Sequence, residues 1–204
     1  MADPHAPPLD VDRLDQALSR HPTRSVSGDD PQRAAVALVF DPALRLLFIR
    51  RSEHEGDPWS GHMALPGGRV EPDDAGPRAA AVRETLEEVG LDLGPARYLG
   101  ALDELASPVR KGRRRLVVHP FAFAVPDVPA LVLNEEVARV HWIGLSRLLA
   151  GEGRGRFDLG WEGRTVAMPV IHIGDADIWG LTLRIVDDLA ARLQEAIPPL
   201  PGAR

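Results

Sequence analysis

One short segment of the chain gathers the residue types that bind divalent cations. The segment LPGGRVEPDDAGPRAAAVRETLEEVGLDL, residues 65–93, holds a double glycine, a run of acids and the three glutamates Glu84, Glu87 and Glu88. Carboxylates packed so closely repel one another unless a cation lies among them. That cation could be a metal ion, a basic partner or an ion of the solvent, and each alternative implies a different function.

The flanking residues predict that the glutamates lie on one helix. Pro77 follows Gly76 and suits a first helical turn, and Gly90 suits the end of a helix. At about 100° per residue, the three glutamates then share an arc of about 100° on a helix over 77–89. The apolar residues of the opposite side are Val82, Leu86 and Val89. We therefore expect one face of this helix in the core and the other face displaying the carboxylates.

A solvated acidic face is the alternative to a metal site. Glutamates at i and i+4 repel on a helix, and in its C-terminal half they oppose the helix dipole. A sequence that tolerates both effects gains something from the clustering, and the obvious gain is Mg²⁺ or Mn²⁺, which prefer oxygen ligands. The glycines of PGGR, residues 66–69, let the backbone approach a ligand. These features indicate metal-assisted attack of water on a phosphate.

The same residues resemble the Nudix box, G-x5-E-x7-R-E-U-x-E-E-x-G-U, in which U is a bulky apolar residue. RETLEEVGL, residues 83–91, matches its second half, with Thr85 at the first U position. In the first half, fourteen residues separate Gly68 from Arg83, one more than in the standard pattern, and Asp74 stands in place of the isolated glutamate. This longer spacing resembles the coenzyme A diphosphatase branch of the Nudix hydrolases.

Three further stretches resemble the same branch. They are LLFIRRSEHEGDPWSGHMALPGG (46–68), NEEV with HWIGLSRLL (134–149) and DIWGLTLRIVDDL (177–189). The resemblance thus covers about residues 34–193. The chain departs from the branch at Gly56-Asp57, where the signature has an arginine, and at Leu65, which replaces a phenylalanine. These departures concern the preference for coenzyme A rather than the Nudix chemistry.

The resemblance implies a Nudix-type α/β/α sandwich with a mixed sheet and metal-dependent hydrolysis of a diphosphate. Glu84, Glu87 and Glu88 would be metal ligands and catalytic residues, assisted by the backbone carbonyl of Gly68. Coenzyme A or its derivatives would be cut to phosphopantetheine and adenosine 3′,5′-bisphosphate with Mg²⁺ or Mn²⁺. The alternative substrates are ADP-ribose, nucleotide sugars and nucleoside triphosphates. A non-catalytic nucleotide-binding Nudix domain is a further alternative, which the intact RETLEEVG disfavours.

The resemblance also implies supporting roles in catalysis. Arg83 would pair with a carboxylate and hold its rotamer. Asp74 would be either a structural acid or a loop cap. The candidates for the base that activates water are the neighbours of Glu88 on the helix and Glu135 or Glu136 in the later loop. Glu136 fits the Glu-Val pair of the branch, whereas Glu135 suits a plain surface loop.

Substrate contacts are expected before and after the box. Arg50 and Arg51 end a predicted strand, and the alternation of strand side chains indicates that only one of them faces the site. Trp59 would stack on a base or pack beneath its loop. RKGRRR, residues 110–115, is either a solvated hairpin tip or a surface that steers an anionic substrate.

The remaining sequence predicts strands around two principal helices, an α/β (α+β) class. Strands are expected over 34–51, as a hairpin turning at Asp41-Pro42, and over 96–105, 114–125, 137–143 and 165–173. Helices are expected around 11–18, at 145–151 and over 177–197. We expect an N-terminal helix and flexible connection over 1–30, a Nudix domain over 31–197 and a tail over 198–204.

Composition and charge disfavour several classes of protein. The 204 residues are 44% hydrophobic, which suffices for one core, and the apolar runs are too short to cross a bilayer. A net charge of −6 argues against nucleic acid as a partner. The chain has no cysteine and no secretory signal pattern, which favours the cytoplasm. The expected partner is a small nucleotide; relatives often form homodimers, although no stretch indicates an interface.

Overall fold

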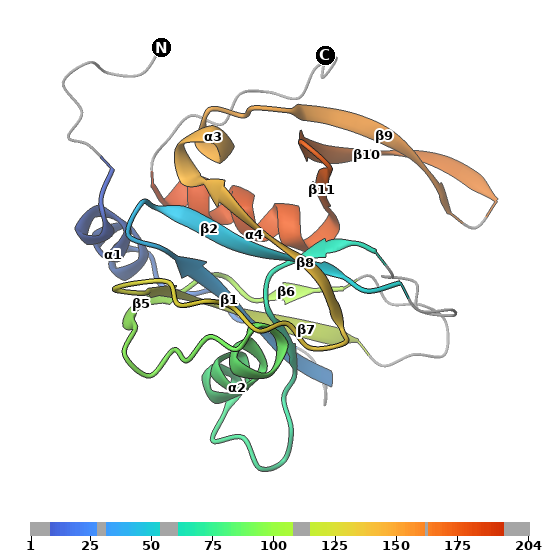
Figure 1. Cartoon of the computed structure of the whole chain (residues 1–204). Coiled ribbons are helices and arrows are strands. Elements are labelled where there is room, and N and C mark those ends of the chain that lie inside the picture. The colour runs from blue at the N-terminus through green and yellow to red at the C-terminus, as the bar shows by residue number, and fades with distance from the viewer. Residues whose placement is uncertain (1–8, 28–31, 54–60, 108–114, 162, 194–204) are drawn as a thin grey trace.

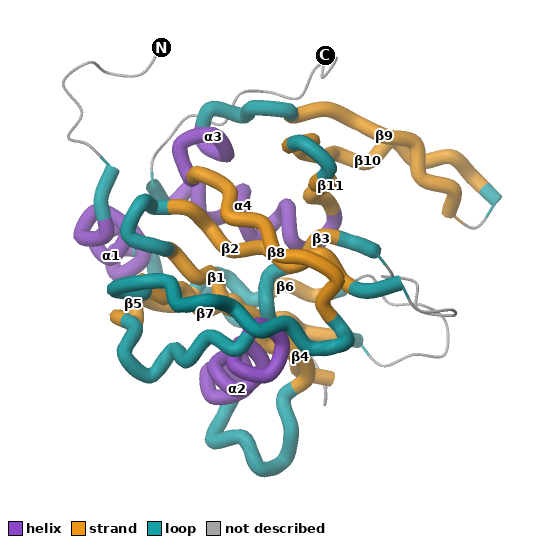
Figure 2. Tube along the Cα trace, in the orientation of Figure 1, coloured by secondary structure: helices purple, strands orange, loops and turns teal. Residues whose placement is uncertain are grey.

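The structure is a computed structural model that describes residues 9–27, 32–53, 61–107, 115–161 and 163–193. A large mixed sheet has helices on both faces and a three-stranded sheet beside it (Figure 1). Figure 2 shows the helix over 77–89 on one side of the large sheet and the helices over 11–20 and 180–192 on the other. The predicted α/β/α arrangement with a mixed sheet is confirmed.

The elements follow one another closely along the chain. The helices are α1 (Val11–Arg20), α2 (Pro77–Val89), α3 (Leu145–Leu149) and α4 (Gly180–Arg192). The strands of the large sheet are β1 (Gln32–Phe40), β2 (Arg45–Arg51), β3 (Met63–Ala64), β4 (Gly67–Arg69), β5 (Arg97–Ala101), β6 (Leu105–Ala106), β7 (Leu116–Ala124) and β8 (Val137–Gly144). The smaller sheet consists of β9 (Arg154–Trp161), β10 (Arg164–Ile173) and β11 (Ala176–Trp179).

Strand β1 organises the large sheet. It runs parallel to β7 along its whole length and pairs with β2 only where the hairpin closes, at Phe40 and Leu46. Beyond that point β1 pairs antiparallel with β4, and β2 pairs with β3 on one side and β8 on the other. The divergence of β1 and β2 therefore brings the glycines of β4 to the middle of the sheet.

The sheet separates two groups of buried apolar side chains. Along β1 and β2 these side chains alternate between the faces, as the geometry of a strand requires. Phe40 and Phe48 pack with α1 and α4 on one face, whereas Leu47 and Ile49 pack with α2 on the other. We call these the α4 face and the α2 face.

Most predicted elements are present. The hairpin over 34–51, the later strands at β7, β8 and β10, and the helix α3 are confirmed. Helix α1 begins at Val11, and its Leu14 and Leu18 are buried on the α4 face. The division of the chain at residue 30 stays a prediction. Within the described ranges, no helix is long and apolar enough to cross a membrane.

Two predicted elements were wrong in extent. The helix expected to start at Asp177 begins at Gly180, because residues 176–179 pair antiparallel with β10 as strand β11. The strand expected over 96–105 is divided into β5 and β6. It is interrupted near Gly100, which has φ 135° and follows a register shift against β7. In both elements the limits depend on pairing with strands that are distant in the sequence, and local sequence patterns do not reveal this pairing.

Candidate active site

Helix α2 begins and ends where the sequence predicts. Gly76 precedes it with φ 143°, a conformation that favours glycine, and Pro77 is its first residue. Gly90 ends the helix in the left-handed region, with φ 68°, and donates its backbone N–H to the carbonyl of Leu86. The prediction of a helix over 77–89 is confirmed.

The orientation of α2 differs from the expectation in one respect. Leu86 was expected in the core, but it is 50% exposed. The buried residues are Ala80, Ala81, Thr85, Glu88 and Val89. Small alanines let the helix approach the sheet closely, and the Thr85 hydroxyl is satisfied because it donates to the Ala81 carbonyl at 2.7 Å. Compared with the prediction, the buried side of α2 is therefore rotated towards the glutamates, so that Glu88 is buried.

Glu88 is a carboxyl group almost removed from water. It is 2% exposed, and its Oε2 accepts the backbone N–H of Gly67 at 2.8 Å. Burial raises the pKa of Glu88 to about 8; the Gly67 hydrogen bond opposes this shift, while the charges of Glu84 and Glu136 add to it and Arg51 opposes it. Near neutral pH this carboxyl therefore keeps its proton in the metal-free chain, and a cation that binds there has to displace that proton.

Arg83 ties the other acids of the segment together. Its guanidinium lies 3.0 Å from Glu84 Oε1 and 2.9 Å from Glu87 Oε2. It also donates to the backbone carbonyl of Arg69 at 3.1 Å and to both carboxylate oxygens of Asp74. Arg83 thus fixes the helix to the preceding loop and holds two of the three glutamates in place, as predicted for a residue that orients carboxylates.

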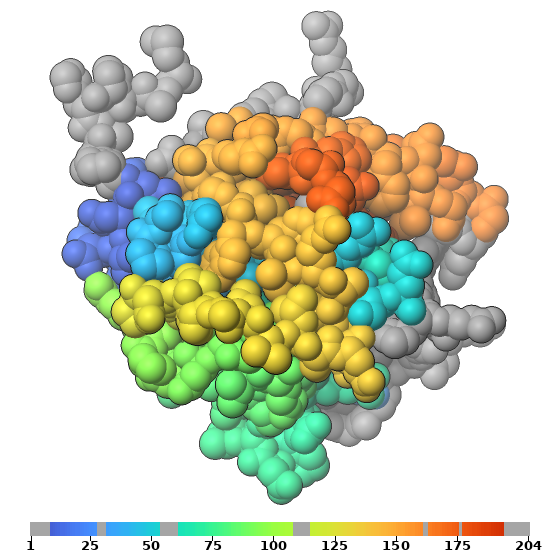
Figure 3. Space-filling model, in the orientation of Figure 1, coloured from blue at the N-terminus to red at the C-terminus, as the bar shows by residue number. Residues whose placement is uncertain are grey.

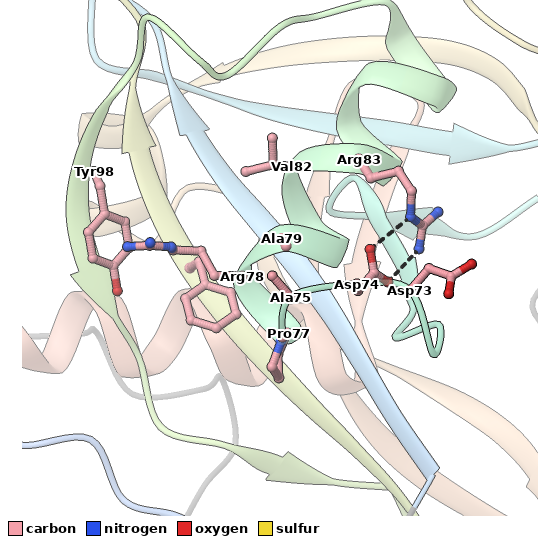
Figure 4. A pocket seen from close by; sticks show the side chains of 11 residues that line it. Asp73, Asp74, Ala75, Pro77, Arg78, Ala79, Val82, Arg83 and Tyr98 are labelled. Atoms are coloured by element: carbon pink, nitrogen blue, oxygen red, sulfur yellow. Dashed lines mark hydrogen bonds and ion pairs between the residues drawn. The ribbon is translucent and has the colours of Figure 1, made fainter.

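Both alternatives for Asp74 are present at once. Its carboxylate pairs with Arg83 (Figure 4) and its Oδ2 accepts the backbone N–H of Glu71 at 2.8 Å. The hydrogen bond from Arg83, and then that from Glu71, hold the pKa of Asp74 below its ordinary value. Asp74 is a structural acid and a loop cap.

The glycines of β4 allow the loop to lie against the glutamates. A Cβ atom at Gly68 would lie 2.3 Å from Glu84 Oε1, so a larger residue there would displace this carboxylate. At Gly67, with φ 148°, a Cβ atom would lie 2.2 Å from the Ala35 carbonyl oxygen. The sequence pattern gave a role to Gly68 alone; the hydrogen bond from Gly67 to Glu88 was missed, although the double glycine was its signal.

The donors of this region suit a hard divalent cation. We define the acidic site as Glu84, Glu87, Glu88 and Gly68. It offers carboxylate and carbonyl oxygens, the ligands that Mg²⁺ and Mn²⁺ prefer, and burial raises the pKa of Glu84 despite Arg83. In the part of the chain described here, no three acidic or histidine side chains already point to one ion position. Metal ligation by these residues stays a prediction that the donor set supports.

Glu136 lies within electrostatic reach of the acidic site. Its charge raises the pKa of both Glu84 and Glu88. Its backbone carbonyl accepts the N–H of Ser52 at 2.8 Å, which fixes the loop before β8 to the end of β2. The structure therefore brings Glu136, one of the candidates for the base, close to the metal-binding candidates.

Arg50 and Arg51 act on opposite faces of the sheet. Arg51 lowers the pKa of Glu88 on the α2 face, whereas Arg50 lowers that of His141, which belongs to the other face. Of the two arginines, Arg51 is thus the one whose charge reaches the acidic site, and contact of either with a substrate stays a prediction. Trp59 and residues 110–114 of the basic segment lie outside the described residues.

A separate cavity of about 840 Å³ lies beside the first turns of α2 (Figure 4). Arg78, Val82, Tyr98 and Phe121 line it, and Arg78 Cζ lies 4.8 Å from the centre of the Tyr98 ring. The three glutamates of the acidic site do not line this cavity. The cavity is therefore distinct from the acidic site, although Asp74 and Arg83 also line it.

Comparison with known proteins identifies the family. A family model described as the Nudix domain matches residues 30–158. The chain belongs to the Nudix family. The prediction of a Nudix hydrolase is confirmed, and hydrolases of this family generally use divalent metals.

Individual relatives of this Nudix protein cover different shares of it. An uncharacterized protein of Schizosaccharomyces pombe is 35% identical over 176 residues, which are 74% of this chain and 54% of that protein. The chain thus spans about half the length of that relative. The mitochondrial coenzyme A diphosphatase NUDT8 of Mus musculus is 30% identical over 209 residues, 94% of this chain and 95% of that protein. The crystal structure of a MutT protein from Methanosarcina mazei Go1 matches with a TM-score of 0.52 and 22% identity, over 82% of this chain and 96% of that one, which shows the shared fold.

Proposed function

We propose that this Nudix hydrolase cleaves the diphosphate of coenzyme A or a close derivative, giving phosphopantetheine and adenosine 3′,5′-bisphosphate. The proposed substrate is supported mainly by the similarity to the mouse coenzyme A diphosphatase over nearly the full length of both chains. The long spacing between Gly68 and Arg83 agrees with the same branch. A cytoplasmic location and a homodimer stay predictions.

The acidic site would hold Mg²⁺ or Mn²⁺ through the three glutamates and the Gly68 carbonyl. A bound ion supplies a Lewis acid that neutralises charge on the phosphate oxygens and makes a water molecule more acidic. Arg83 keeps Glu84 and Glu87 in fixed rotamers through its contacts of 3.0 and 2.9 Å. Gly67 does the same for Glu88 through its backbone N–H. The ligands are thereby preorganised before substrate binds.

The protein side chains account for the movement of the proton in this proposal. Glu136 is an exposed carboxylate within electrostatic reach of Glu84 and Glu88, and it accepts the proton of the attacking water. The water oxygen bonds to one phosphorus as the bridging P–O bond breaks, and the leaving phosphate departs as an anion. Arg51, on the same face, offers its positive charge to the phosphates.

Mass spectrometry of the products tests this proposal. The protein is incubated with Mg²⁺ or Mn²⁺ and coenzyme A, acetyl-coenzyme A, ADP-ribose, a nucleotide sugar or a nucleoside triphosphate. We expect phosphopantetheine to appear fastest. Cleavage of another compound, with coenzyme A left intact, would show that the proposed substrate is wrong and that diphosphate hydrolysis is right. The feature that favours this outcome is Gly56-Asp57, where the branch has an arginine.

A pair of neighbouring glutamates tests the proposed base. Glu136→Gln should lower kcat about a hundredfold with little change in KM, because the amide cannot accept the proton. Glu135→Gln is the matched control, since Glu135 is also exposed and lies in the same loop. Equal activity of the two variants would remove Glu136 from the mechanism.

A further inference from the structure

The α4 face carries an unusual arrangement of positive charge. In the antiparallel pairing of β2 with β8, Arg50 lies directly opposite Arg139, and Phe48 lies opposite His141. Residues paired in this way share one face of the sheet. Like charges directly opposite each other destabilise a strand pair. We define the basic cluster as Arg50, Arg139 and His141.

One carboxylate compensates this cluster in part. Asp175, in the turn between β10 and β11, lies 2.6 Å from Arg139 Nη1 and 3.8 Å from His141 Nδ1. Among the described residues, Arg50 forms no ion pair. Burial lowers the pKa of His141, so its imidazole adds no charge near neutral pH. Two guanidinium groups therefore face one carboxylate, which leaves an excess of positive charge.

The basic cluster also contains an unsatisfied polar atom. Within the described part of the chain, His141 Nε2 is buried and has no hydrogen-bond partner. A buried polar atom without a partner destabilises the folded state. A ligand oxygen that reached this atom would remove that penalty.

The basic cluster is distinct from the acidic site. Arg50 follows Phe48 on the α4 face, whereas Arg51 on the other face acts on Glu88. On the surface shown in Figure 3, β8 in yellow-orange lies next to the turn before β11 in red-orange. The side chains of Arg139 and Asp175 are 63% and 51% exposed. A solute can therefore reach the cluster from solvent.

We propose that Arg50 and Arg139, with His141 beside them, bind a phosphomonoester dianion on the α4 face. The planar guanidinium groups match the oxygens of a phosphate, and the anion would replace part of the contact between Arg139 and Asp175. The phosphate would belong either to the substrate, as the 3′-phosphate of coenzyme A does, or to a separate ligand. Assigning the phosphate to the substrate rests on the proposed function, whereas the binding site itself is independent of that function.

Calorimetric titration with inorganic phosphate tests the site in metal-free protein. Arg50→Gln should weaken phosphate binding about tenfold, the effect of one lost charge-assisted hydrogen bond. Asp175→Asn should tighten it, because the competing carboxylate is gone. Arg164→Gln, which removes an exposed arginine from β10, is the matched control and should bind as the wild type does. Equal binding by Arg50→Gln and Arg164→Gln, with both folded by circular dichroism, would overturn the proposal.

Kinetics then assign the source of the phosphate. If Arg50→Gln raises KM for coenzyme A about tenfold and leaves KM for 3′-dephospho-coenzyme A unchanged, the site holds the substrate's own phosphate. If it changes neither KM while phosphate binding is lost, the site serves a separate ligand. If neither compound is cleaved, the proposed function fails, and the phosphate titration still decides the proposed site.

Discussion

The two faces of the sheet at the end of β2 each carry a group of like charges, but these charges differ in sign and in how they are neutralised. On the α2 face, Arg83 pairs with Asp74, Glu84 and Glu87, and Glu88 is left buried against the backbone N–H of Gly67. On this face the carboxylates outnumber the arginines that pair with them, and hydrogen bonds hold them in place.

On the α4 face, the imbalance has the opposite sign. Asp175 pairs with Arg139, and Arg50 shares the same face of the strand pair. Arg50 and Arg51 are adjacent in sequence but act on different faces. The end of β2 thus has an excess of carboxylates on one side and an excess of guanidinium groups on the other, and the two proposed sites, one for a cation and one for an anion, follow this difference.

The largest effect is expected at the buried carboxyl of the α2 face. Glu88→Gln should lower kcat/KM about a thousandfold for whichever diphosphate is cleaved, because the amide is a poor cation ligand of nearly the same shape. The melting temperature should not fall, since the Gly67 N–H can still donate to the amide oxygen. Steady-state kinetics and thermal melts check both parts. Wild-type turnover by this variant would contradict a catalytic role for the acidic site.

The two glycines of β4 provide a second, smaller contrast. Gly68→Ala should lower kcat about a hundredfold and leave stability nearly unchanged, because the new Cβ, 2.3 Å from Glu84 Oε1, displaces only a side-chain end. Gly67→Ala should instead unfold more easily, because its Cβ would meet the Ala35 carbonyl oxygen at 2.2 Å and its φ is 148°. Urea unfolding and kinetics of both variants distinguish them. Similar stability losses in both variants would contradict this assignment.

The buried carboxyl also predicts a pH dependence of stability in metal-free protein. The pKa of Glu88 is about 8 in the folded chain, against an ordinary value of 4.5. Between these values the folded state holds a proton that the unfolded state has lost, so the free energy of unfolding should fall as pH rises from about 4.5 to about 8. Urea unfolding in EDTA at both ends of the range measures the change. Glu88→Gln should flatten it; an equal slope in that variant would assign the effect to other groups.

The smallest effect concerns the outward side of α2. Leu86→Ala should change the free energy of unfolding by less than about 0.5 kcal/mol, because Leu86 is half exposed. Val89→Ala should destabilise by about 2 kcal/mol, because Val89 is fully buried on the same helix. Urea unfolding measures both. A large loss at Leu86 would mean that α2 packs as its apolar pattern first suggested.

The sequence predicts the limits of α2 better than its rotation. Glycine and proline determine where the helix starts and stops, and this chemistry is local. Which side is buried depends on what the sheet presents to it: Ala80 and Ala81 allow close contact, and the Thr85 hydroxyl bonds within its own helix. A pattern that assigns large apolar residues to the core therefore placed Leu86 inside and Glu88 outside.

The candidate site was predictable where it follows a contiguous motif. Arg83, the three glutamates and Gly68 lie within one segment, so their resemblance to the Nudix box was visible directly. The basic cluster was not, because it depends on the register that pairs Arg50 with Arg139, 89 positions further along the chain (139 − 50). Strand β11 escaped prediction for the same reason, since its pairing with β10 is not visible in DIWG alone.

The most decisive measurement is the ratio of kcat/KM for coenzyme A to that for ADP-ribose, made with Mn²⁺ in the full chain. We expect coenzyme A to be preferred by at least about tenfold. We also expect the products to be phosphopantetheine and adenosine 3′,5′-bisphosphate, and Glu88→Gln to lower both rates about a thousandfold. A preference for ADP-ribose, or wild-type turnover by Glu88→Gln, would contradict these expectations.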